Sequence, residues 1–67
     1  MLERRLALAE KLVAQAKNHI AGQQAAIERL ERTGADTTIA NDLLDMMRQA
    51  LAGHERERDY IVALLKK

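Results

Sequence analysis

The stretch Thr33-Gly34-Ala35-Asp36-Thr37 decides the fold, because it is the one place in the 67-residue chain where turn-forming residues cluster. Gly34 can adopt the positive φ with which many helices end. Asp36 or Thr37 can then accept hydrogen bonds from the free N–H groups at the start of a second helix. Because the connection is so short, the flanking helices must be antiparallel neighbours. The sequence therefore predicts an all-α fold, an antiparallel two-helix hairpin that forms a single domain.

The predicted first helix, over about residues 2–32, carries an unbroken heptad stripe. Steps of four and three residues alternate along the whole segment, and Gln23 is the only polar residue among these positions. Such a stripe is typical of a helix that packs along a partner helix, as in a coiled coil. The stripe consists of Leu2, Leu6, Ala9, Val13, Ala16, Ile20, Gln23, Ile27 and Leu30.

The predicted second helix, over about residues 37–66, follows a turn at about 33–36 and has a wider apolar surface. We expect one of its stripes to face the first helix, with facing residue numbers that sum to about 70 in an antiparallel pair. A second apolar line lies beside this stripe, and Ile39, Met46 and Tyr60 flank its other side. The facing stripe is Ala40, Leu43, Met47, Ala50, His54, Glu57, Ile61 and Leu64, and the second line is Leu44, Leu51 and Leu65.

The width of this surface predicts self-association. A lone hairpin covers one stripe per helix and would leave the second line exposed to water. Two hairpins related by two-fold symmetry would cover it in a four-helix bundle, so we expect a homodimer. A different protein partner is the alternative occupant of the surface. The predicted core of the hairpin and its dimer comprises Leu6, Val13, Ile20, Ile27, Leu30, Leu43, Leu44, Met47, Leu51, His54, Ile61 and Leu65.

Polar residues interrupt the apolar lines at Gln23 and at His54, Glu57 and Arg58. A polar residue at a core position can fix register and oligomeric state at a cost in stability, and we favour this interpretation. Metal binding is an alternative, because His54 and Glu57 lie three residues apart on one helix face, as in carboxylate bundles. The expected facing positions on the first helix are apolar, however, and we expect no metal site.

Two regulatory functions are further alternatives. Dimeric hairpins of some sensor kinases carry a phospho-accepting histidine, but it lies on the first helix, faces solvent and precedes a proline. Here His54 is on the second helix, His19 is followed by Ile20, and the chain has no proline. Small hairpin dimers also bind paired RNA loops through a basic stripe. The best basic cluster, interleaved with Glu3 and Glu10, is Arg4, Arg5, Lys11 and Lys17.

Composition limits the remaining functions. The chain has no cysteine, which excludes disulfides and thiolate metal sites. Eleven basic residues balance ten acidic ones, so nucleic acid and anionic membranes are not expected partners. The N-terminus lacks the apolar run of a signal peptide, and no segment approaches the roughly 20 apolar residues of a membrane span. We expect a cytoplasmic protein, complete from Met1, with no enzymatic activity, because no nucleophile or cofactor motif is present.

The turn Gly34-x-Asp36-Thr37, followed by Ala40 and Leu43-Leu44, lies within a longer pattern of spaced residues. The other positions of this pattern are His19, Ile20, Gln23, Ile27, Leu30, Met47, Leu51 and His54. Over about residues 18–65 this pattern resembles a type of short hairpin protein from alphaproteobacteria, especially rhizobia-like ones. In that family an aromatic residue often stands at the position of Met47. The resemblance implies a helical hairpin and a bacterial source, and it transfers no catalytic or binding residue. We expect a non-enzymatic, self-associating structural or protein-interaction module.

Overall fold

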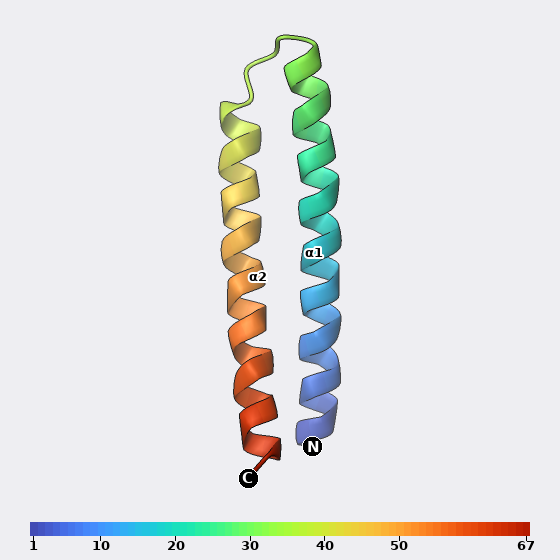
Figure 1. Cartoon of the computed structure of the whole chain (residues 1–67), viewed down its shortest axis with the longest axis vertical. Helices are drawn as coiled ribbons and strands as arrows, with labels where there is room; N and C mark the ends of the chain where they lie inside the picture. Colours follow the sequence, from blue (N-terminus) through green and yellow to red (C-terminus); the bar gives the residue numbers. More distant parts are fainter.

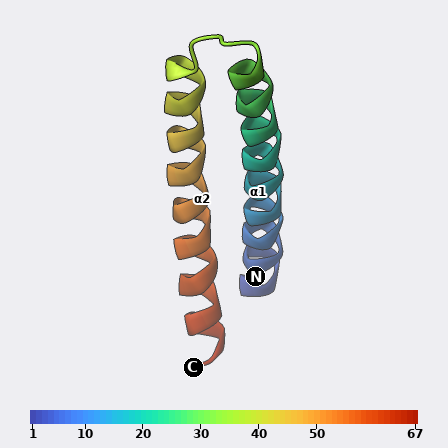
Figure 2. The same ribbon diagram turned by 45° about the horizontal axis from the view of Figure 1, so that its top comes forward.

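The computed structural model describes residues 1–67 and contains two helices and no strand. Helix α1 spans Leu2–Arg32 and helix α2 spans Thr38–Leu65. The helices lie antiparallel in a rod of 52 × 14 × 13 Å, with both termini at one end and the turn at the other (Figure 1). A tilted view shows the same two-helix rod (Figure 2). The all-α hairpin predicted from the sequence is confirmed.

The end of α1 is a Schellman motif built around Gly34. Gly34 has a φ of 74°, the left-handed conformation that favours glycine. Its N–H donates to the Glu31 carbonyl at 3.1 Å, and the Ala35 N–H donates to the Leu30 carbonyl at 3.0 Å. These two bonds satisfy carbonyls that would otherwise lack partners at the helix end. The predicted role of Gly34 in closing the first helix is confirmed.

The start of α2 is capped by Asp36 rather than by Thr37. The Asp36 Oδ1 atom accepts from the Thr38 N–H at 2.9 Å and from the Thr38 hydroxyl at 2.7 Å. These two bonds, the hydroxyl one first, lower the pKa of Asp36 below its ordinary value. The Thr37 hydroxyl instead accepts from the Asn41 amide at 3.0 Å. Asp36 therefore satisfies a first-turn donor of α2.

The seam between the helices is narrow and contains only aliphatic side chains in its buried part. Four of its six buried residues come from α1, all from the predicted stripe, and two come from α2. Small residues at two of these positions allow the helix axes to approach closely, which suits two long helices with few large side chains. The buried residues are Ala9, Val13, Ala16, Ile27, Leu44 and Ile61.

Helix α2 is rotated about its axis relative to the prediction. Leu43, Ala50 and Glu57, which were expected to face α1, are exposed. Leu44 is buried and Leu51 is half-buried, so the expected second line supplies the seam instead. Both lines of α2 follow three- and four-residue steps. The line that faces α1 in the structure contains Leu44 and Leu51, whereas the predicted line contains Ala50 and Glu57. The line with the leucines therefore buries more apolar surface.

The remaining predicted core residues are either half-buried or exposed. In the single chain Leu43 and Leu65 are exposed, and six of the predicted core residues are half-buried. The expectation that Leu44 and Leu51 stay exposed in a lone hairpin was therefore wrong, whereas Leu65 is exposed. The half-buried residues are Leu6, Ile20, Leu30, Met47, Leu51 and His54.

The register of the two helices also differs from the predicted one. The Gln23 amide donates to the Ala40 carbonyl at 2.9 Å, and Arg5 pairs with Glu57 at 2.7 Å. These residue numbers sum to 63 and 62, below the predicted value of about 70. The cause is visible at the turn, where α1 extends past the start of α2 and the chain descends beside it before α2 begins (Figure 1).

Candidate interaction surface

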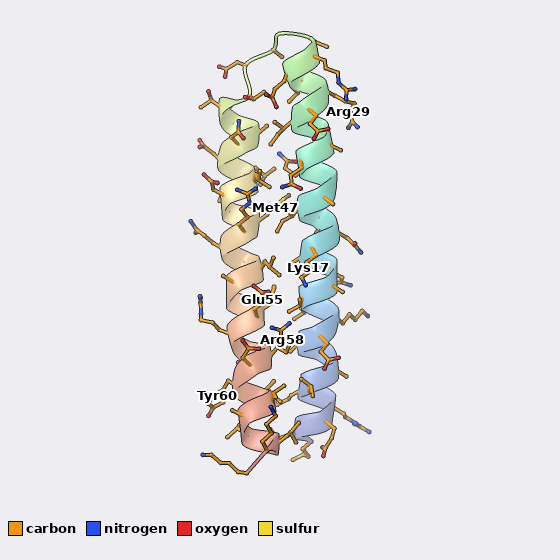
Figure 3. All side chains as sticks on the ribbon, viewed as in Figure 1. Lys17, Arg29, Met47, Glu55, Arg58 and Tyr60 are labelled. Carbon is orange, nitrogen blue, oxygen red and sulfur yellow. The ribbon has the colours of Figure 1, made fainter.

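Large apolar side chains remain exposed along one line of α2. Ile39, Leu43, Met46 and Tyr60 are each between 42% and 85% exposed. Their positions follow one heptad line of three- and four-residue steps that also passes through Ala50. Tyr60 is directed away from α1 (Figure 3). This line is separate from the seam and has no partner within the hairpin.

Helix α1 contributes two leucines, Leu8 and Leu12, to grooves that lie between the two helices. One groove lies beside Leu8 and Leu12 and is bounded by Arg5, Ala9 and Glu57. The next is about 180 Å³ in volume, shares Leu12 and crosses to Met47 and Ala50 on α2. Leu12 thus links the two grooves, which place Leu8 of α1 and Ala50 of α2 on the same side of the rod. We call this side the apolar face, and define it as Leu8, Leu12, Ile39, Leu43, Met46, Ala50 and Tyr60.

The opposite side of the hairpin is polar. Its groove is lined by Gln24, Glu28, Glu31 and Asn41 where the seam residues Ile27 and Leu44 come to the surface. Carboxylates and amides at such positions remain hydrated without a partner. The hairpin is therefore two-sided, with apolar side chains concentrated on one flank of the seam.

Both histidines of the chain lie in the larger groove of the apolar face. His19 on α1 and His54 on α2 line it together with Gln15 and Ala16. The carboxylate of Glu57, the predicted companion of His54, accepts from Arg5 on α1 instead. No group of three or more His, Cys, Asp or Glu side chains gathers in the structure to hold a metal ion.

Gln23 and Arg58 both point into the space between the helices. Gln23 is half-buried, and its hydrogen bond to the Ala40 carbonyl links the two helices. Arg58 is directed toward α1 in Figure 3 and pairs at 3.0 Å with its neighbour Asp59. No buried side-chain nitrogen or oxygen lacks a partner. The hydrogen bond of Gln23 can form only when Gln23 of α1 lies near Ala40 of α2. Gln23 therefore favours one register between the two helices.

The basic cluster of α1 is partly neutralised by acids. Arg5 pairs with Glu57, and Glu3 pairs with the N-terminal ammonium at 3.3 Å. A backbone hydrogen bond, followed by the N-terminal ammonium, lowers the pKa of Glu3, so this carboxylate remains charged beside Arg4 and Arg5. Acidic side chains therefore interrupt the positive charge of this cluster.

No protein-family model, curated protein or solved structure matches this chain. The resemblance to short alphaproteobacterial hairpin proteins therefore stays a prediction. Neither α1 nor α2 contains an apolar stretch of the length and hydropathy that crossing a membrane requires. The candidate site is therefore defined by the physical properties of the surface.

Sequence reasoning identified part of the apolar face. Ile39, Met46 and Tyr60 were placed at the edge of the apolar surface of the second helix, but were not assigned to an interface. Leu8 and Leu12 were missed. Each stands one residue before a seam position, Ala9 and Val13, and the four-residue spacing of the two leucines was the available signal.

Proposed function

We propose that this protein is a non-enzymatic helical hairpin that self-associates through the apolar face and serves as a structural or protein-interaction module in the cytoplasm. The apolar face is the observation that carries the proposal. It holds five of the hairpin's seven exposed large apolar side chains, namely Leu8, Ile39, Leu43, Met46 and Tyr60. Apolar surface that gathers on one side of a small protein is typical of an association site. A second copy of the chain presents the same face, so two copies can cover each other in an isologous contact.

The exposed area of the single hairpin fits this proposal. The chain exposes 5100 Å². A compact folded monomer of its 7.5 kDa mass would expose about 4,200 Å² by the usual scaling with size. The excess of about 900 Å² follows from the elongated shape of the hairpin, which measures 52 × 14 × 13 Å. A standard interface takes roughly 800 Å² from each partner, and a rod of this shape has enough free surface along one side to supply it.

The small core supports the same conclusion. Six buried residues, two of them alanines, provide little hydrophobic stabilisation for 67 residues. Chains of this size without disulfides or metals usually depend on a partner for stability. Docking of a second hairpin on the apolar face would create a second layer of core contacts, in the manner of a four-helix bundle.

The test is a pair of charge-introducing variants. Leu43→Asp places a carboxylate on the apolar face, and Gln24→Asp makes the same charge change at an exposed position that lines the polar groove on the opposite side. We expect light scattering after size-exclusion chromatography to give a dimer for the wild type and Gln24→Asp, and a monomer for Leu43→Asp. A wild-type monomer, or a Leu43→Asp dimer of unchanged affinity, would contradict the proposal.

A further inference from the structure

We infer that the second hairpin docks antiparallel to the first, so that the turn end of each copy covers the open end of the other. This inference rests on the proposed function, because it specifies how the second copy lies on the apolar face. Two-fold symmetry allows two arrangements of face-to-face hairpins, one with the turns at the same end and one with the turns at opposite ends. Both arrangements cover the same apolar face.

The charge distribution along the rod does distinguish them. Residues 18–49 form the half of the hairpin nearer the turn and carry five acidic and three basic side chains, a net charge of −2. Residues 1–17 and 50–67 form the open half and carry five acidic and eight basic side chains, a net charge of +3. The two values add up to the chain's formal charge of +1. The hairpin is thus negative at the turn end and positive at the open end.

The exposed groups at the two ends match this polarity. At the open end Arg4 is exposed and forms no ion pair within the hairpin, and it lines a surface depression with Arg5 and the first two residues of the chain. Arg5 itself is already paired with Glu57. Near the turn, Asp36 and Asp42 are exposed, and neither forms an ion pair within the hairpin. Antiparallel docking brings opposite charges together at both ends of the interface. Parallel docking brings like charges together at both ends, which is destabilising for a specific interface.

The test uses single spin labels, because the chain has no cysteine of its own. Ala35→Cys places a label in the turn, and Gln49→Cys places one near mid-height on α2, at an exposed position. Pulsed electron–electron double resonance then measures the distance between the two labels of a dimer. Light scattering on the same samples checks that the labelled protein has the dimer mass. Antiparallel docking predicts a turn-to-turn distance close to the 52 Å length of the hairpin. Parallel docking predicts about 20 Å, roughly two helix diameters.

The mid-height label separates the two ways in which the experiment can fail. In either arrangement it should report a short distance, on the order of 20–30 Å across a four-helix bundle. A long turn-to-turn distance with a short mid-height distance supports antiparallel docking. Short distances at both positions overturn antiparallel docking and leave self-association intact. A monomeric mass with no dipolar signal at either position overturns the proposed function itself.

Salt provides an independent test of the cause. Complementary end charges predict that the dimer dissociation constant rises severalfold from low to high salt, because screening weakens the attraction between the ends. A dissociation constant that falls with salt would indicate like charges in contact and would overturn antiparallel docking.

Discussion

Leu43 and Leu44 are adjacent in the chain but point to different surfaces, with Leu44 7% exposed in the seam and Leu43 42% exposed on the apolar face. The step of about 100° per residue in an α-helix separates them. Leu44 therefore holds α2 against α1, whereas Leu43 is free to contact a partner.

Truncating these two leucines should have unequal effects on the hairpin. Leu44→Ala removes buried contacts, and we expect a loss of about 2–4 kcal/mol in the free energy of unfolding. Leu43→Ala should cost less than about 1 kcal/mol when measured on the monomer, since its side chain is already partly hydrated. Urea unfolding followed by circular dichroism at low protein concentration measures both. Equal losses in the free energy of unfolding would contradict the burial of Leu44, rather than Leu43, against α1.

The cross-helix hydrogen bond of Gln23 should contribute measurably to stability. Gln23→Ala removes the donor to the Ala40 carbonyl, and we expect a loss of about 1 kcal/mol. The neighbouring Gln24 is exposed and makes no hydrogen bond with its side chain, so Gln24→Ala is the matched control and should change stability by less than about 0.5 kcal/mol. Thermal melts of the two variants provide the comparison. If Gln23→Ala is as stable as Gln24→Ala, the hydrogen bond from Gln23 to Ala40 does not stabilise the register of the helices.

Two glycines should respond in opposite directions to substitution by alanine. Gly34→Ala forces a side chain into a φ of 74°, and we expect a loss of about 1 kcal/mol. Gly22 lies within α1 with nothing within 4 Å of the added Cβ, so Gly22→Ala should stabilise the hairpin by up to about 1 kcal/mol. The melting temperature should therefore fall for Gly34→Ala and rise for Gly22→Ala, each relative to the wild type. Stabilisation by Gly34→Ala would contradict the Schellman motif at the turn.

The cap formed by Asp36 predicts a dependence of stability on pH. Hydrogen bonds from Thr38 lower the pKa of Asp36 from an ordinary value of 3.8. The charged carboxylate therefore stabilises the fold fully above this ordinary value, and the contribution is lost as the pH falls through the lower folded-state pKa. The difference in melting temperature between the wild type and Asp36→Ala should stay constant from neutral pH to about pH 5 and shrink below about pH 4. A difference that grows toward acid pH would contradict the cap.

The helices, the turn and the seam line of α1 could be predicted because each depends on local signals. Gly34 and Asp36 specify the turn, and the stripe of α1 offers one strong apolar line. The rotation of α2 could not be predicted in the same way, since α2 carries two parallel lines that share Met47 and His54. The choice between them depends on which line buries more apolar surface against α1, and that is a property of the packed pair.

The apolar face was only partly predictable for a related reason. Once Leu44 rather than Leu43 occupies the seam, Leu43 moves to the surface together with Met46. The same rotation exposes Ala50 on that surface. Leu8 and Leu12 join it only through the grooves that cross from α1 to α2. These relationships depend on how the helices are placed side by side.

If a second copy of the chain covers the apolar face, the protein must dimerise in solution. Sedimentation equilibrium of the wild-type protein over a wide concentration range measures this mass without assuming a shape. We expect a reversible equilibrium that approaches twice the 7.5 kDa chain mass at high concentration. A single species at the monomer mass throughout, with full helicity, would contradict self-association.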